Sequence, residues 1–184
     1  MKSKKHNLEI LAIYILVAVF FVAANGCHRE KIYFKESFEK EENNVLSVFS
    51  NKNIWKKSVD ILLKKNTKLL WQWKGSPEEN YKFWLKLLFA NHKTIYYVAQ
   101  GSRNPDVAGE RYRGKDERMR FSPAVVISAL PISSEKWINI TVNIELDYLK
   151  HCGATFRDIK ITEIEIYMDT PGELHIDNLI IGHY

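Results

Sequence analysis

The sequence predicts an all-β fold, an antiparallel sandwich, and three observations support it. Apolar and polar residues alternate with a period of two in several short runs, as expected for strands with one buried face. Turn signals such as Gly101–Pro105 and Thr170–Gly172 separate most of these runs. Only Asp147–Ala154 and Val59–Lys65 have a pattern compatible with a helix. Many short strands with little helix are typical of two packed sheets.

The clearest strands are Lys68–Lys74 and Tyr81–Phe89. In the first, Leu69, Trp71 and Trp73 share one face, because successive side chains of a strand point to opposite sides. Exposed tryptophans could form a platform for stacking sugar rings. Because Leu69 accompanies them on an apolar face, we expect both tryptophans to pack in the core.

The remaining strands are shorter or less regular. A pair of acidic residues, Glu163 and Glu165, falls on one face of such a strand, and we expect that face to be solvated rather than catalytic. The further expected strands are Lys31–Glu39, Val45–Phe49, Ile95–Ala99, Ala124–Ala129, Trp137–Leu146, Ile159–Met168 and Glu173–Ile181.

Residues 1–26 have the pattern of a signal peptide. Lys2, Lys4 and Lys5 form a positive start, and Ile10–Ala24 is an uncharged apolar run. This run is shorter than the roughly twenty residues that a membrane-spanning helix needs. We therefore expect a signal or anchor helix to precede the folded domain, which would then lie outside the cytoplasm.

The end of this segment, Ala24–Cys27, resembles a bacterial lipobox, in which a lipidated cysteine becomes the new N-terminus. The resemblance implies lipidation of Cys27, a tether at 27–30, one domain at 31–184 and a lipid-anchored place in the bacterial cell envelope. Ordinary secretion and an uncleaved anchor are the alternatives. If Cys27 carries lipid, Cys152 has no partner for an intramolecular disulfide.

The net charge and the sequence motifs limit the classes of function that this chain can have. The formal net charge is +5, and without residues 1–26 the chain is only mildly basic. That charge is too small to require a nucleic acid as partner, and it suits an acidic polysaccharide better than a neutral one. The six histidines are scattered without metal-ligand spacing, and no Gly-rich phosphate loop or Gly-x-Ser-x-Gly motif occurs. The residues therefore predict a domain without catalytic machinery of its own.

Four stretches carry a family resemblance: Phe38–Glu39, Asn66–Gly75, Phe83–Leu85 and Glu173–Ile181. In order and spacing they resemble strands of the N-terminal jelly-roll domain of chondroitin sulfate ABC lyases. The resemblance covers most of residues 31–182. Its last strand is similar to those of many galactose-binding-like jelly rolls and carbohydrate-binding modules.

This resemblance implies a galactose-binding-like jelly roll over residues 31–184. Those lyases cleave their substrate in a helical toroid that follows the jelly roll, and the sequence ends at Tyr184 without it. We therefore expect a surface-tethered, non-catalytic module that binds a glycan, in particular an acidic glycosaminoglycan. Two alternatives are a detached or truncated lyase domain and a module that binds another protein of the envelope.

The candidate ligand contacts are basic and aromatic. Arginine pairs bidentately with carboxylate and sulfate groups, so the arginine-rich segment after residue 102 could hold an acidic glycan. A solvated loop with mutually neutralising charges is the alternative. The predicted contacts are Arg103, Arg111, Tyr112, Arg113, Arg118, Arg120 and the expected exposed aromatic Trp55, with Trp84 and Trp137 as weaker candidates.

A structural calcium ion is implied by the resemblance alone. Many galactose-binding-like jelly rolls hold calcium between their first and last strands, where Glu39 and Asp177 fall in this sequence. Carboxylate oxygens suit calcium. We expect no cofactor that the domain requires for activity.

Overall fold

The computed structural model describes residues 31–38, 46–49, 52–76, 81–105, 124–153, 155, 157–169 and 172–183. Lys31–His183 forms a compact unit of its own. The predicted signal helix at 1–26, Cys27 and the tether at 27–30 lie outside the described residues. The described unit is all-β apart from one helix, in agreement with the predicted sandwich.

One sheet, called sheet A here, holds five strands in the order β1-β10-β4-β8, with β2 also paired to β10. All of its pairings are antiparallel. Strands β1 and β2 follow one another along the same long strand, β10, at its two ends. The bounds are β1 Lys31–Glu36, β2 Leu46–Phe49, β4 Thr67–Ser76, β8 Ile138–Asn143 and β10 Glu173–His183.

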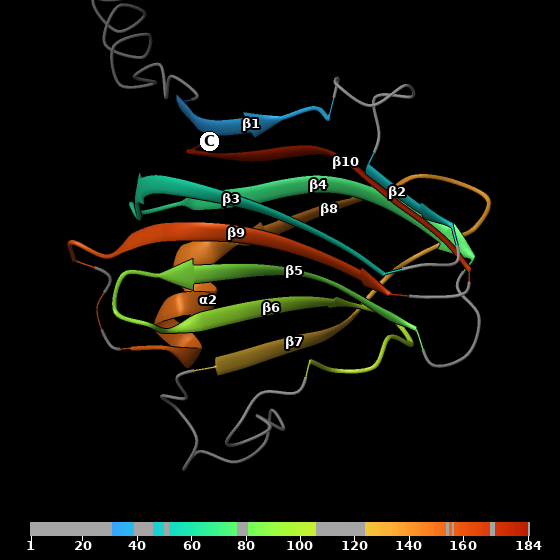
Figure 1. Ribbon diagram of the computed structural model, residues 1–184. Helices are drawn as coiled ribbons and strands as arrows, with labels where there is room; N and C mark the ends of the chain where they lie inside the picture. The colour runs from blue at the N-terminus through green and yellow to red at the C-terminus, as the bar shows by residue number, and fades with distance from the viewer. Residues whose placement is uncertain are drawn as a thin grey trace, which may run out of the picture. The chain divides into compact units, whose positions relative to one another are not determined.

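The second sheet, sheet B, has the order β3-β9-β5-β6-β7. Figure 1 shows these five strands side by side as one layer, with the helix partly behind it. Their bounds are β3 Lys52–Leu62, β5 Lys82–Phe89, β6 Thr94–Ala99, β7 Ala124–Leu130 and β9 Lys160–Asp169.

Aromatic rings join the two sheets across the core. Trp73 of β4 lies 4.9 Å from Phe83 of β5, and Trp71 lies 5.8 Å from Tyr97 of β6, measured between ring centroids. Trp71 and Trp73 are at most 1% exposed, so the prediction that they are core residues is confirmed. Aromatic pairs at this spacing add roughly 0.5–1.5 kcal/mol each to the burial of their area.

The predicted strand Trp137–Leu146 was too long, because a helix begins within it. Helix α2 spans Ile144–His151, and the side chain of Asn143 caps it by accepting a hydrogen bond from the Leu146 amide at 3.1 Å. Asn at this position satisfies an amide that the first helical turn leaves without a partner. The predicted helix at Asp147–Ala154 therefore exists but starts three residues earlier.

The prediction of a helix at Val59–Lys65 was wrong, and strand β3 was missed. Residues up to Leu62 pair with β9 instead. The lysines around Trp55 suggested a polar loop, but they are exposed positions of an edge strand. The Trp55 ring faces inward, 5.3 Å from Phe38, and is partly buried against the core. Trp55 is therefore not the exposed aromatic that the sequence predicted.

The sandwich is not antiparallel throughout, because β6 and β7 pair in parallel, with Ile95 opposite Val125. A parallel pair requires a long connection back to the starting end of the sheet. The segment between Ala99 and Ala124 is long enough for that return. Strand alternation carries no signal for the direction of pairing, so the sequence pattern could not reveal it.

We predict that Gly75→Ala destabilises the fold by about 1–3 kcal/mol, the usual range for overpacking. A Cβ at Gly75 would meet the Glu173 carbonyl oxygen at 2.5 Å and the Leu174 side chain at 2.7 Å. Gly153→Ala is the matched control, because its Cβ would find nothing closer than 3.5 Å. Urea unfolding of the full chain, followed by tryptophan fluorescence, measures both. Equal stability of the two variants would contradict the packing described for β4 and β10.

Candidate functional site

The outer face of sheet A carries polar and apolar side chains in rows that cross the strands. Because Leu69, Trp71 and Trp73 fill the core, the alternate residues Leu70 and Gln72 must face outward. Gln72 is paired with Asn139 of β8 and Asp177 of β10, and Leu70 is paired with Thr141 and Ile180. An amide and carboxylate row thus lies beside a largely apolar row.

A β-bulge in β10 gives the first of these rows its shape. Ile176 and Leu179 are both fully buried although they are three residues apart, which simple alternation forbids. The register shift between Asp177 and Ile180 resolves the conflict by adding one residue. Asn178 takes the strained position with φ of 51°, a left-handed conformation that Asn tolerates better than most residues.

The bulge positions Asn178 as one end of a hydrogen-bonded ladder across three strands, the amide ladder. Its Nδ2 donates to Gln72 Oε1 at 3.1 Å, and Gln72 Nε2 donates to Asn139 Oδ1 at 2.7 Å. Asn178 Nδ2 also donates to Asp177 Oδ2 at 3.1 Å. Asp177 is half-buried, and burial raises the pKa of its carboxyl group.

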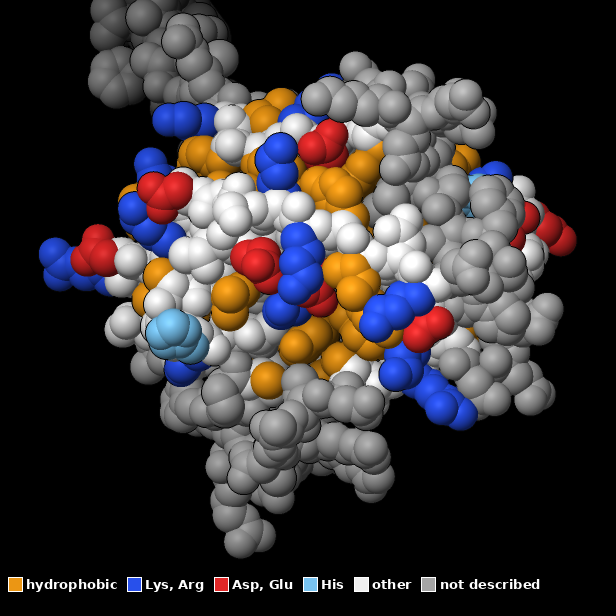
Figure 2. All heavy atoms as spheres, viewed as in Figure 1, with side chains coloured by type: hydrophobic (Ala, Val, Ile, Leu, Met, Phe, Trp, Pro, Cys, Tyr) orange, Lys and Arg blue, Asp and Glu red, His pale blue; other side chains and the backbone are white. Residues whose placement is uncertain are grey.

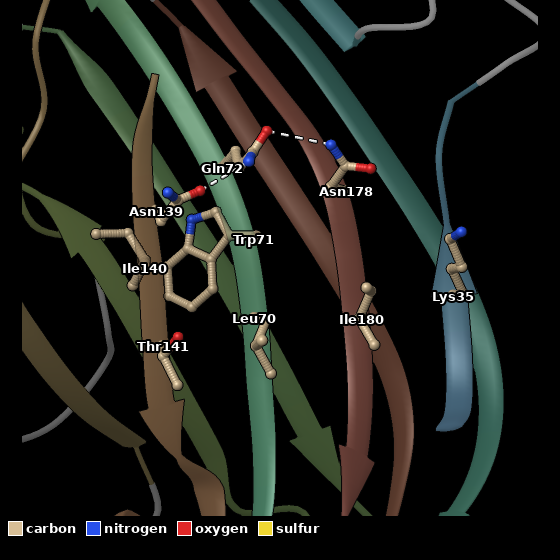
Figure 3. A pocket seen from close by; sticks show the side chains of 9 residues that line it. All are labelled: Lys35, Leu70, Trp71, Gln72, Asn139, Ile140, Thr141, Asn178 and Ile180. Atoms are coloured by element: carbon tan, nitrogen blue, oxygen red, sulfur yellow. Dashed lines mark hydrogen bonds between the residues drawn. The ribbon is translucent and has the colours of Figure 1, made fainter. Parts of the chain in front are cut away.

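The three amides Asn178, Gln72 and Asn139 line an open groove of about 330 Å³ on sheet A. Figure 3 shows the amide ladder along one part of the groove, with Leu70 and Ile180 beside it and Lys35 on the neighbouring strand. Trp71 and Ile140, which belong to the core, contribute to the lining. The groove crosses four strands, a width of roughly 14 Å at the usual strand spacing. We call it the sheet A groove.

A basic and aromatic cluster occupies the next row along the same face. Lys74 lies over the Trp137 ring with its Nζ 5.4 Å from the centroid, a cation–π contact. His175, paired with Lys74 across the strands, lies 6.2 Å from Trp137 and forms a close hydrogen bond with Glu173. The hydrogen bond from His175 lowers the pKa of the Glu173 carboxyl group.

The lysines on this face have no acidic partner among the described residues. No carboxylate pairs with Lys35, Lys68 or Lys74 there. The nearby carboxylates are already occupied, Glu173 by His175 and Asp177 by Asn178. The outer face of sheet A therefore carries three lysines without an ion-pair partner among the described residues, on the same face as the amides and the Asp177 carboxylate.

The outer face of sheet B is different, because its charges neutralise one another. Figure 2 shows lysine and acidic side chains side by side across the middle of that face. Glu165 is 8% exposed and pairs with Lys56 at 2.6 Å and with Lys86 at 3.4 Å. Glu163 and Glu165 do lie on an outer face, but Glu165 is enclosed between lysines rather than freely solvated. Trp84 is buried by stacking on Tyr167 at 4.4 Å.

None of the predicted ligand contacts that the structure describes lines the sheet A groove. Arg103 is described and exposed, and its amide donates to the Tyr81 carbonyl oxygen at 2.8 Å, at the start of the arginine-rich segment. Trp137, one of the two weaker aromatic candidates, lies against Lys74 and His175 in the row next to the groove. The other predicted contacts lie outside the described residues: Arg111, Tyr112, Arg113, Arg118 and Arg120.

The amide ladder was not predicted from the sequence, although one signal was present. In β10 the apolar positions Ile176 and Leu179 are out of phase, with Asp177 and Asn178 between them. A shift of this kind within a strand indicates a bulge, and bulges often re-aim side chains beside functional sites. The partners Gln72 and Asn139 are separated by 67 positions, so no local pattern connects them.

Calcium remains an expectation from the resemblance. Glu39 lies outside the described residues, and no group of three or more possible metal ligands occurs within the described part of the chain. Asp177 accepts hydrogen bonds from Asn178 through both carboxylate oxygens, at 2.7 Å and 3.1 Å. That carboxylate therefore has a structural role in the bulge.

A second group of titratable side chains is buried at the α2 end of the core. The Tyr97 hydroxyl donates to Asp147 at 3.0 Å, and burial raises the pKa of both groups. Burial raises the pKa of the Cys152 thiol to about 12. These groups hold α2 against the sandwich, and a thiol with this pKa is a poor nucleophile at neutral pH.

The chain has no match among the protein-family models or the curated proteins. In the part of the chain that the structure describes, no helix has the length and apolar character needed to cross a membrane. The assignment of a function therefore rests mainly on the geometry of the sheet A groove.

We predict that Asn178→Ala destabilises the protein more than Asn178→Gly, by about 1 kcal/mol. Both variants lose the hydrogen bond to Gln72, but only alanine must also adopt the positive φ of 51°. Urea unfolding of the two variants separates these effects. A lower stability of the glycine variant would contradict the left-handed bulge.

The Glu173–His175 pair predicts a change of stability at acid pH. The folded-state pKa of Glu173 is lowered, so its contribution is present above the unfolded value of about 4.3 and is lost as pH falls through the folded value. Glu173→Gln should reduce the loss of stability below pH 5. Denaturant unfolding of both proteins at several pH values between 3 and 6 measures this. If both proteins lost stability equally as the pH falls, a stabilising contribution from ionised Glu173 would be ruled out.

Proposed function

We propose that the sheet A groove binds a carbohydrate chain that carries acidic groups, as a non-catalytic binding site. The observation that carries the proposal is the amide ladder beside an apolar row. Side-chain amides can donate to and accept from sugar hydroxyls, while Leu70 and Ile180 offer apolar surface to the C–H face of a pyranose. Sites for small polar ligands commonly combine apolar walls with a few placed polar groups.

The ends of the ladder keep hydrogen-bonding groups that no described residue uses. Asn139 accepts through Oδ1, which leaves its NH2 group as a donor, and Asn178 donates through Nδ2, which leaves Oδ1 as an acceptor. Asn139 is exposed and Asn178 half-buried, so a ligand in the groove can reach both. Because Asn139 and Asn178 lie two strand spacings, or roughly 10 Å, apart, the complementary acceptor and donor must be well-separated groups along the sugar chain.

The charges favour an acidic glycan. Lys35 lines the groove, and Lys68 and Lys74 lie on the same face without acidic partners among the described residues. Carboxylate or sulfate groups of a glycosaminoglycan would supply those partners. The contrast with sheet B, where Lys56 and Lys86 are paired with Glu165, supports the choice of sheet A.

The wider context of this proposal rests on the sequence. The resemblance to chondroitin sulfate ABC lyases supports a jelly-roll topology of the galactose-binding-like type. The pattern of residues 1–27 supports export and lipid anchoring through Cys27. Together they support a binding module tethered to the cell envelope that presents a glycan near a surface.

We predict that the full chain binds chondroitin sulfate, dermatan sulfate or heparin at low ionic strength, and that affinity falls as salt is added. Lys35→Ala should weaken binding roughly two- to fivefold, the range of an exposed ion pair. Asn139→Ala should weaken it roughly two- to tenfold through the lost hydrogen bond. Calorimetry or gel retardation measures both.

Lys160→Ala is the control, because it removes one positive charge from sheet B, where Lys160 pairs with Asp60 at 2.9 Å. It should bind like the unmodified chain. Absence of binding to all three glycans at low salt, or an equal loss in Lys160→Ala and Lys35→Ala, would exclude the sheet A groove as the binding site.

A further inference from the structure

The amide ladder has a direction, and one residue sets it. An amide side chain can in principle be turned over, exchanging its oxygen and its NH2 group. If Asn178, Gln72 and Asn139 all turned over, the same hydrogen bonds would form with donors and acceptors exchanged. The ladder by itself therefore fits the groove equally well in two directions.

Asp177 removes this ambiguity. Its carboxylate can only accept, and Oδ2 receives a hydrogen bond from Asn178 Nδ2 at 3.1 Å. A reversed Asn178 would place its carbonyl oxygen against that carboxylate. Because Asn178 Nδ2 must face Asp177, Gln72 must turn Oε1 toward Asn178 and Nε2 toward Asn139. The single negative charge of Asp177 thus fixes the orientation of all three amides, on β10, β4 and β8.

We propose that Asp177 is the specificity-determining residue of the sheet A groove, because it fixes a donor at Asn139 and an acceptor at Asn178. This inference rests on the proposed carbohydrate function. It defines the ligand more closely: the sugar presents a hydrogen-bond acceptor, such as a carboxylate, sulfate or ring oxygen, over β8. It presents a free hydroxyl donor over β10. A sugar with these groups in the opposite order is disfavoured.

The bulge explains why this arrangement is possible at all. In a regular strand, adjacent residues point to opposite faces, so Asp177 and Asn178 could not both reach the groove side. The register shift and the φ of 51° at Asn178 bring its side chain back beside that of Asp177. The Asp177 Oδ1 atom accepts the Asn178 amide at 2.7 Å and holds the pair in place.

Asp177→Asn tests the proposal, because an asparagine can donate as well as accept and so permits both directions. The variant keeps the size of the side chain, but its single oxygen can replace only one of the two acceptors. If the oxygen accepts the Asn178 backbone amide, an NH2 group faces the Asn178 side chain and the reversed ladder forms. If it accepts Asn178 Nδ2, the original direction is kept. In NMR spectra of the unmodified full chain, the Gln72 NH2 protons should show contacts to the Asn139 Cβ protons and not to those of Asn178. In the variant they should show both. An unchanged pattern in the variant, or both contacts in the unmodified chain, overturns the proposal.

Binding of a chondroitin sulfate oligosaccharide provides a second readout. If half of the variant molecules hold the ladder reversed, the Kd should rise about twofold. Loss of a negative charge alone would strengthen binding to an anionic glycan, so a weaker complex cannot arise from charge. Asp158→Asn is the charge control, because that side chain is 88% exposed and pairs only with Arg157 among the described residues. Tighter binding by Asp177→Asn than by the unmodified chain overturns the proposal.

The two proposals fail in different ways. If the NMR contacts change as expected but the unmodified chain does not bind the oligosaccharide, the direction of the ladder stands and the carbohydrate function falls. If the unmodified chain binds and the contacts do not change, only the role of Asp177 falls. Urea unfolding of Asp177→Asn shows whether the variant is folded under the conditions used.

Discussion

The strict alternation of strand β4 is the constraint on which both the core and the groove depend. Trp71 and Trp73 join the two sheets from its inner side, and Leu70 and Gln72 form the centre of the groove on its outer side. A slip of one residue against β10 would exchange the two faces. The large rings therefore do more than fill space, since their burial also fixes where the amides of the ladder must lie.

The alternation of apolar and polar residues was sufficient to predict the inner strands. It was not sufficient to predict the edge strand β3 or the start of helix α2. Strands β4 and β5 were found because Leu69 to Trp73 and Phe83 to Phe89 alternate against a buried face. Strand β3 was missed because its lysines are exposed at the edge of the sheet. With these lysines as neighbours in the sequence, Trp55 was not recognised as part of an apolar face. Helix α2 was placed three residues late because the cap at Asn143 is a local hydrogen bond that competes with alternation.

The candidate site was harder to predict than the fold. The sequence directed attention to arginines and exposed aromatics, whereas the described surface is built from amides, aliphatic residues and lysines. Gln72, Asn139 and Asn178 come from three strands that are adjacent only after pairing. Among the candidates that the structure describes, only Trp137 was both suggested by the sequence and located beside the groove. Neutral amides carry no recognisable spacing, so their role becomes visible through the geometry of the sheet.

The burial of Cys152 gives the α2 end of the domain a built-in reporter. The thiol is fully enclosed beside Tyr148, and its side chain is inaccessible to reagents as long as the helix stays docked. Alkylation at this position can proceed only through molecules in which the helix has transiently detached. The rate of that reaction thus measures local opening under native conditions, independently of the groove on the far side of β4.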